Sequence, residues 1–112
     1  MRQARWTEHG VEVAEVAPPP LEADWVRLRV LACGICGTDL HLWRRELPAP
    51  LGIAPGHEIA GTPLSGPRGL DAALYAVEPI EVCGICAFCV AGRRQLCEKL
   101  SIIGVMRSGG IA

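Results

Sequence analysis

Four cysteines near the end of the chain restrict its fold more than any other feature. Their spacing is Cys83-x2-Cys86-x2-Cys89-x7-Cys97. A tight loop with this spacing can bring four thiolates onto one ion, and Gly84 and Gly92 give its backbone the freedom to turn. Four sulfurs at about 2.3 Å in a tetrahedron saturate a zinc ion. We therefore interpret residues 83–97 as a lobe closed around structural zinc, with no open position for chemistry.

An iron–sulfur electron carrier is the main alternative for this lobe. Bacterial ferredoxins also use C-x2-C-x2-C, but their fourth cysteine follows after three residues and precedes proline. Here seven residues intervene and Glu98 follows Cys97. A zinc ribbon would instead pair two C-x2-C arms across a longer gap. Four thiols within one short segment rarely arise for packing alone, so the spacing favours zinc.

The rest of the chain predicts a mainly β fold. Its 13 glycines and 9 prolines among 112 residues favour short strands and turns over a helical bundle. We expect a helix capped by Thr38 or Asp39 that runs to about Arg45, followed by a loop over 46–56. The expected strands cover 11–16, 25–30, 59–64 and 74–77. Together these elements indicate a small, partly open β-barrel from which the lobe at 83–97 protrudes.

Charge and hydropathy exclude several functional classes. The net charge is −1 and no long run of Lys or Arg occurs, which argues against a nucleic-acid or acidic-lipid surface. No stretch approaches the roughly 20 apolar residues of a membrane span, and no apolar run follows the charged N-terminus as in a secretory signal. We therefore expect reduced thiols that hold metal, and the cytoplasm as the compartment.

A second group of metal-binding residue types lies upstream of the lobe. It combines Gly34-Ile-Cys-Gly-Thr-Asp-Leu-His41 with Gly56-His-Glu58. Each stretch alone is weak evidence for a metal site, because a lone cysteine is more often a small buried hydrophobic residue than a ligand. Beside a separate structural lobe the combination is specific, because catalytic zinc prefers mixed cysteine and histidine ligands with one position left open.

These three motifs, in this order, are similar to one known family. The chain resembles the N-terminal catalytic domain of the zinc-dependent medium-chain alcohol dehydrogenases, whose fold is called GroES-like. The resemblance runs from the first strand to Ala112 and includes the Pro55-Gly-His-Glu58 stretch. It implies that residues 1–112 are an incomplete catalytic domain, with the structural zinc lobe at 83–97.

The resemblance implies a role for each residue of the second group. Cys36 and His57 match the first two ligands of the catalytic zinc, and Glu58 matches an acid behind that zinc that is an occasional ligand. Asp39 matches a carboxylate that orients the zinc-bound histidine. Cys33 matches no ligand, and we expect it to serve packing.

The implied reaction is the oxidation of an alcohol or polyol with NAD or NADP. Thr38 matches the hydroxyl that takes the proton from a zinc-activated alcohol, and His41 matches the outer end of that relay. Within this family, Gly37 and the stretch Gly92-Arg-Arg-Gln-Leu-Cys97 are more similar to the threonine and polyol dehydrogenase branches. The substrate and the choice between NAD and NADP stay open.

The chain also departs from the family pattern. The third protein ligand of the catalytic zinc and the nucleotide-binding domain lie downstream of this region in the family, and no G-x-G-x-x-G follows a strand here. The stretch Gly69-Leu-Asp-Ala-Ala-Leu-Tyr75 is shorter than its usual counterpart. We therefore expect a segment of a longer, oligomeric enzyme that is inactive alone, with the oligomeric state of the segment open. The alternative is a non-catalytic zinc scaffold or partner-binding module.

Overall fold

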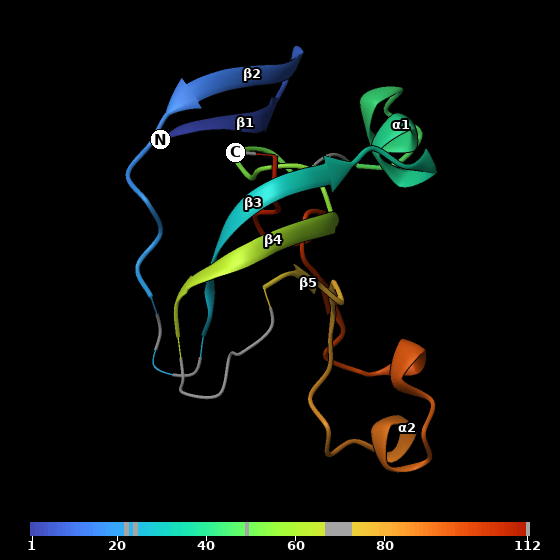
Figure 1. Ribbon diagram of the computed structural model, residues 1–112. Coiled ribbons are helices and arrows are strands. Elements are labelled where there is room, and N and C mark those ends of the chain that lie inside the picture. Colours follow the sequence, from blue (N-terminus) through green and yellow to red (C-terminus); the bar gives the residue numbers. More distant parts are fainter. Residues whose placement is uncertain (22, 24, 49, 67–72, 112) are drawn as a thin grey trace.

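In the part of the chain that the structure describes, the fold consists of three small antiparallel sheets, a short helix beside them and a protruding lobe (Figure 1). The computed structural model describes residues 1–21, 23, 25–48, 50–66 and 73–111. Within these residues no sheet has more than three strands. The prediction of a mainly β, partly open architecture with a short helix is therefore confirmed.

The first sheet is a hairpin of β1 (Arg2–Thr7) and β2 (Gly10–Glu15). The Thr7 hydroxyl donates a 3.3 Å hydrogen bond to the Gly10 carbonyl, and Gly10 has φ 125°, which a residue with a side chain rarely adopts. Ala4 and Trp6 alternate onto the buried face of β1. Only the second strand was predicted. The alternation of Ala4 and Trp6 with polar neighbours was the available signal for the first.

The second sheet has the order β3-β4-β5. It contains β3 (Arg27–Gly34), β4 (Glu58–Ser65) and β5 (Tyr75–Ala76). The pairing register places Gly34 opposite Glu58 and Val30 opposite Gly61. The three strands predicted here are present with shifted bounds. Residues 67–72, which include most of the stretch 69–75 discussed above, lie outside the described part of the chain.

Two short strands flank the cysteine lobe, namely β6 (Ile80–Glu81) and β7 (Ser101–Ile102), which pair with each other. Between them the lobe contains α2 (Ala87–Val90) and the 3₁₀ turn η1 (Arg94–Leu96). Figure 1 shows this lobe projecting at the opposite end of the molecule from the β1–β2 hairpin. Gly84 and Gly92 both have φ 74°, which confirms their predicted role in turning the backbone.

Helix α1 (Gly37–Trp43) begins one or two residues before the predicted cap positions. The N-cap is Cys36, and neither Thr38 nor Asp39 takes that position. The Cys36 sulfur accepts a hydrogen bond from the Thr38 backbone N–H (3.2 Å), and Asp39 accepts one from the Cys36 N–H (3.0 Å). This is a capping box in which sulfur replaces a hydroxyl. The helix ends at Trp43 and does not reach Arg45, whose φ of 59° is incompatible with helix.

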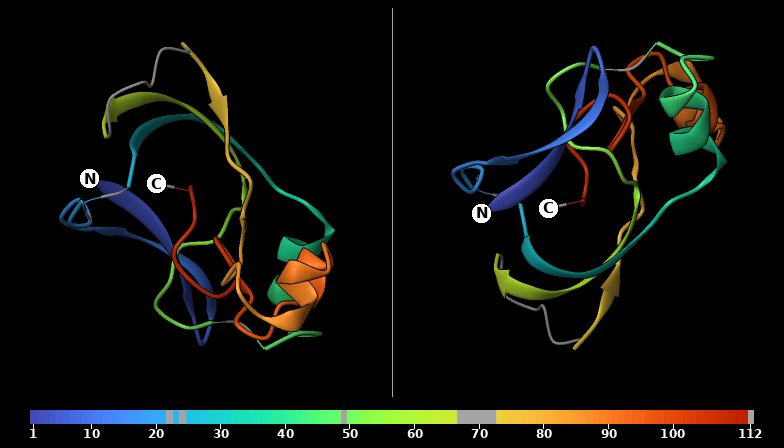
Figure 2. Two further views of the ribbon diagram at one scale, coloured as in Figure 1. Left: turned by 90° about the horizontal axis from the view of Figure 1, so that it is seen from below. Right: turned by 90° about the horizontal axis from the view of Figure 1, so that it is seen from above.

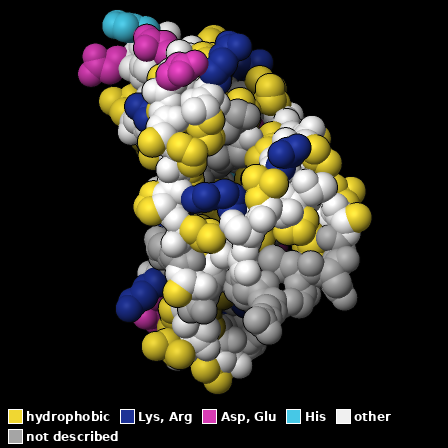
Figure 3. Space-filling view, turned by 60° about the vertical axis from the view of Figure 1, so that its left-hand side comes forward, with side chains coloured by type: hydrophobic (Ala, Val, Ile, Leu, Met, Phe, Trp, Pro, Cys, Tyr) yellow, Lys and Arg dark blue, Asp and Glu magenta, His cyan; other side chains and the backbone are white. Residues whose placement is uncertain are grey.

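The hydrophobic core is small. Among the described residues the buried apolar ones are few: Ala4, Trp6, Leu42, Ala54 and Cys97. Large apolar side chains are scattered over the face seen in Figure 3, and Leu31, Ile35 and Ile85 are all more than half exposed. Backbone hydrogen bonding must therefore contribute much of the order of this chain.

The C-terminal segment ties the sheets together. The Gly109 N–H donates to the Ala54 carbonyl (2.8 Å), and the Ile111 N–H donates to the Pro55 carbonyl (3.1 Å). The Ala4 N–H in turn donates to the Ile111 carbonyl (3.0 Å). Figure 2 shows this segment lying between the hairpin and the β3–β4 pair. The loop that leads into β4 is therefore held from both sides.

Candidate metal centres

Two elements distant in sequence bring the first cluster together. Cys36 lies between the end of β3 and the start of α1, while His57 and Glu58 lie at the start of β4. The Cys36 sulfur is 3.0 Å from His57 Nε2. One ligand atom from each of Cys36, His57 and Glu58 lies within 4.8 Å of the others. We call these three residues the mixed cluster, and the second predicted metal set is brought together as a unit.

The backbone around Gly56 fixes the direction of His57. Gly56 has φ 93°, and a Cβ there would overlap the sulfur of Cys33 and the side chain of Ile111. The Gly56 carbonyl accepts a 3.0 Å hydrogen bond from the Gly110 N–H. Cys33 thus packs against Gly56, as predicted, and burial raises the pKa of the Cys33 thiol, with the Asp39 carboxylate adding to the rise. No sequence pattern indicates the contact between Gly110 and Gly56.

Asp39 connects the two ends of the mixed cluster. Its side chain is 5% exposed, and the Oδ2 that accepts from the Cys36 N–H lies 4.0 Å from His57 Nδ1. Asp39 Oδ1 and His57 Nδ1 are both buried without a hydrogen-bond partner among the described residues. A metal on Nε2 would place the ring proton on Nδ1, facing this carboxylate. The donor set and its unpaired ring nitrogen therefore fit a zinc ion.

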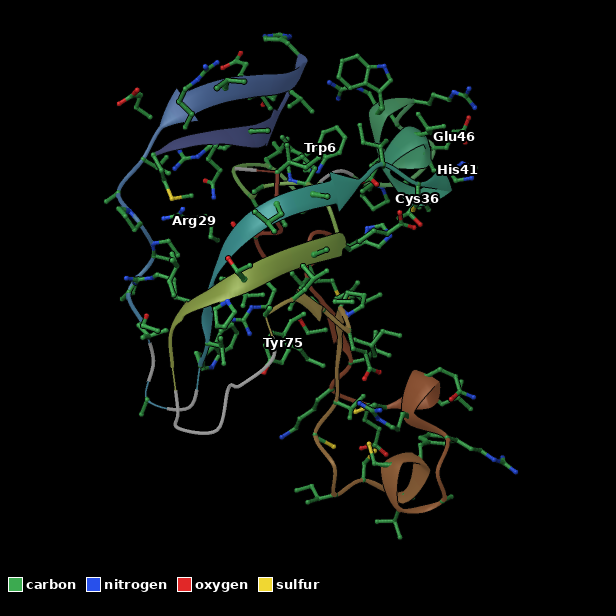
Figure 4. All side chains as sticks on the ribbon, viewed as in Figure 1. Trp6, Arg29, Cys36, His41, Glu46 and Tyr75 are labelled. Atoms are coloured by element: carbon green, nitrogen blue, oxygen red, sulfur yellow. The ribbon has the colours of Figure 1, made fainter. Side chains whose placement is uncertain are left out.

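Thr38 and His41 lie on α1, the helix whose N-cap is Cys36 of this cluster. Thr38 is half-buried, and His41 is exposed at the outer end of α1, where its Nδ1 contacts the Glu46 carboxylate (Figure 4). Residues three apart on a helix are neighbours on its surface. The proton relay between Thr38 and His41 stays a prediction.

The four lobe cysteines form a second cluster with tetrahedral spacing. Four sulfurs bound to one zinc at about 2.3 Å stand about 3.8 Å apart. Cys83 Sγ lies 4.0 Å from Cys89 Sγ and 3.6 Å from Cys97 Sγ, and all four sulfurs lie within 4.8 Å of one another. These cysteines form no disulfide. Iron–sulfur clusters interpose several atoms between their thiolates, so this close spacing favours a single ion.

Backbone N–H groups point at the lobe sulfurs. Cys97 Sγ accepts from the N–H groups of Cys83 and Lys99, both at 3.3 Å. The Cys83 N–H lowers the pKa of Cys97, and the backbone at Glu98 lowers the pKa of Cys86 to about 6. Desolvation by burial, followed by the neighbouring Cys86 side chain, raises the pKa of Cys89. The backbone thus favours thiolate charge on Cys86 and Cys97, whereas the surroundings of Cys89 favour its protonated form.

Comparison with known proteins decides the family. The family model described as the alcohol dehydrogenase GroES-like domain matches residues 22–112.

The chain belongs to the alcohol dehydrogenase GroES-like domain family.

The proteins similar to this chain include three dehydrogenases. The chain is 36% identical to an L-threonine 3-dehydrogenase of Pyrococcus furiosus, over 94% of this chain and 32% of that protein. Galactitol-1-phosphate dehydrogenase from Escherichia coli matches with a TM-score of 0.87 at 31% identity, over all of this chain and 34% of that one. A cobalt- and zinc-bound thermostable alcohol dehydrogenase from Pyrobaculum aerophilum matches with a TM-score of 0.80 at 28% identity, over 98% and 36%.

The chain spans about a third of the length of these relatives. The similarity covers both cysteine-containing clusters and the surrounding sheets, since it extends over at least 94% of this chain. Among the helices that the structure describes, none is long and apolar enough to cross a membrane.

Proposed function

We propose that this chain supplies the metal-binding and alcohol-activating part of a zinc-dependent, NAD(P)-linked alcohol or polyol oxidoreductase. The observation that carries this proposal is the convergence of Cys36, His57 and Glu58 on one point, with the buried Asp39 carboxylate behind the histidine. A soft sulfur, an imidazole and a carboxylate form a donor set suited to catalytic zinc.

The residues of the mixed cluster would have different roles in binding the ion. Cys36 and His57 provide the tight ligands, and Glu58 provides an exposed carboxylate at the rim. Asp39 accepts a hydrogen bond from the Cys36 N–H, and its Oδ2 lies 4.0 Å from His57 Nδ1, so a small shift would let it orient the metal-bound ring as well. When bound, zinc would supply Lewis-acid polarisation of an alcohol or carbonyl oxygen.

Thr38 and His41 would carry the proton. The Thr38 hydroxyl lies two residues from Cys36 in the first turn of α1, where a substrate hydroxyl could reach it. His41 lies one turn further out and is solvent-exposed, so it can exchange a proton with water. Glu46 orients the His41 ring.

The four-cysteine lobe would serve structure alone. Its four thiolates fill a tetrahedral zinc, so no position remains for a substrate. Six free thiols suit a reducing compartment such as the cytoplasm.

The threonine 3-dehydrogenase and galactitol-1-phosphate dehydrogenase relatives favour a small, polar, hydroxyl-rich substrate. Hydride transfer to NAD or NADP would require the nucleotide-binding part of a longer parent. Turnover of alcohols with NAD(P) by the 112-residue chain alone would contradict the assignment of hydride transfer to a separate nucleotide-binding part.

Cobalt substitution tests the proposal on the chain as it stands. Cobalt in the mixed cluster should give a visible spectrum that shifts when a polyol or imidazole is added, because one coordination position is open to solvent. Cys36→Ser should abolish the responsive component and leave the four-thiolate spectrum unchanged. A spectrum that never responds to added ligand, or that survives Cys36→Ser intact, would contradict an open catalytic site.

A further inference from the structure

Gly34 faces Glu58 directly across the β3–β4 pair. A Cβ placed on Gly34 would overlap Oε2 of the Glu58 carboxylate, and it would lie 3.1 Å from Glu58 Cβ and 3.3 Å from Glu58 Cδ. The Glu58 side chain thus lies in the space that any other residue at position 34 would fill.

The requirement for glycine at this position comes from space and not from backbone conformation. Gly56 needs glycine because its φ of 93° disfavours a side chain. Gly34 is not among the glycines with positive φ, so alanine could adopt its backbone conformation. The three atoms nearest to a Cβ at Gly34 all belong to the Glu58 side chain.

Glu58 is exposed, and nothing described in the structure donates a hydrogen bond to its carboxylate. An exposed glutamate has several rotamers of similar energy, and most of them point to solvent. Its carboxylate nevertheless lies within 4.8 Å of the Cys36 and His57 ligand atoms. Because Gly34 has no side chain, there is room for the rotamer in which the Glu58 side chain lies along β3 toward the ligand atoms of Cys36 and His57.

We propose that Gly34 is a positioning residue for the mixed cluster. By lacking a side chain it lets the Glu58 carboxylate lie against β3 and join Cys36 and His57 as the third ligand from this chain. This inference rests on the proposed metal site and adds a residue that binds no metal itself. A side chain at position 34 would turn Glu58 toward solvent and leave two ligands.

Three glycine-to-alanine variants separate this role from a general effect on the sheet. In Gly34→Ala the added methyl group would overlap the Glu58 side chain. Gly61→Ala lies in the same β3–β4 pair but meets the backbone of Arg29, with the carbonyl oxygen at 2.5 Å. Gly37→Ala lies beside Cys36 and meets no atom within 4 Å.

The measurement is the zinc affinity of the mixed cluster, determined by competition with a chelator after the lobe has been filled. We expect Gly34→Ala to weaken binding by about tenfold or more, the effect typical of residues that orient a ligand. Gly37→Ala should bind as the parent does. Gly61→Ala should lower the melting temperature without a matching loss of affinity. Equal losses in Gly34→Ala and Gly61→Ala would overturn the inference.

The Glu58→Ala background completes the test. If Gly34 acts through the carboxylate, Gly34→Ala should weaken zinc binding strongly in the parent and hardly at all when Glu58 is already alanine. An undiminished effect in that background, or an unchanged affinity in Glu58→Ala itself, would overturn the inference and leave the proposed function standing. Zinc binding at the mixed cluster that survives Cys36→Ala would instead overturn the proposed function.

Discussion

The two clusters reach similar ligand spacing by opposite routes. The lobe gathers four thiolates from one 15-residue segment (83–97), in which Cys97 is the only buried residue. The mixed cluster joins Cys36 to His57 and Glu58 across more than twenty residues, and a hydrogen-bonded strand pair holds the two ends. We therefore expect the lobe to depend on a bound metal for its order, whereas the mixed cluster is assembled by the sheet and would leave a position open for chemistry.

Removal of metal should produce the largest difference between the two regions. Without zinc, residues 83–97 have almost no apolar burial to hold them, so we expect their amides to lose essentially all protection from hydrogen exchange. The amides of β3 and β4 should keep theirs, because their partners are in the sheet. Hydrogen-exchange mass spectrometry before and after chelation measures both. A lobe that stays protected without metal would contradict this contrast.

Substitution of Asp39 should lower both the stability of the chain and the zinc affinity of the mixed cluster, without an effect on the lobe. We expect Asp39→Ala to weaken zinc binding there by about 10–100-fold, and to cost about 1 kcal/mol of stability through the lost capping bond to the Cys36 N–H. Asp39→Asn keeps an acceptor for that N–H, so it should retain most of the stability and still lose metal affinity. Chelator competition and thermal melting of both variants separate the two effects.

Glu46→Ala serves as the control for Asp39. This exposed acid lies just beyond the same helix and contacts His41, not the ligands. Equal losses of zinc affinity in Glu46→Ala and Asp39→Ala would show a general charge effect.

Thiol reactivity tests whether the lobe keeps its geometry without metal. In the ordered lobe the pKa of Cys86 is lowered to about 6 by backbone hydrogen bonds at Glu98, while burial raises the pKa of Cys89. Because we expect the metal-free lobe to lose this order, iodoacetamide should alkylate the two cysteines at similar rates. A rate for Cys86 that is about tenfold faster or more would contradict this, since the thiolate is the reactive form and only the ordered lobe favours it at Cys86. Peptide mapping of the alkylated chain measures both rates.

Arg107 should give the smallest effect. Its guanidinium donates to both oxygens of Glu81, at 3.0 and 3.1 Å, and lies 4.4 Å from the ring centroid of Trp25. This contact joins the segment before β3 to the strand that leads into the lobe. Because the groups are partly exposed, Arg107→Ala should cost about 1 kcal/mol or less. Zinc content should stay unchanged, and a loss of metal would mean that the two regions are not independent.

Local motifs explain most of what the sequence predicted. The lobe was predictable because its ligands are close in sequence, and Cys36 with His57 because their motif resembles a known family. The N-cap at Cys36 was missed because rules for helix caps favour oxygen over sulfur. Strand β1 was missed because its buried face has only Ala4 and Trp6.

The remaining features depend on long-range contacts. No sequence pattern places Gly110 against Gly56, since the two residues meet only after the C-terminal segment folds back between the sheets. The clearance between Gly34 and Glu58 likewise follows from the β3–β4 register, which two irregularities adjust. Pairing across such distances is a property of the tertiary structure.

Zinc content per chain tests the central claim most directly. Elemental analysis of protein purified without added metal should find close to two zinc ions per chain. Cys36→Ala should leave one, held by the lobe, and Cys89→Ala should also leave one, held by the mixed cluster. One zinc that is lost in Cys89→Ala and unaffected by Cys36→Ala would contradict the account of the mixed cluster, and iron with sulfide would contradict that of the lobe.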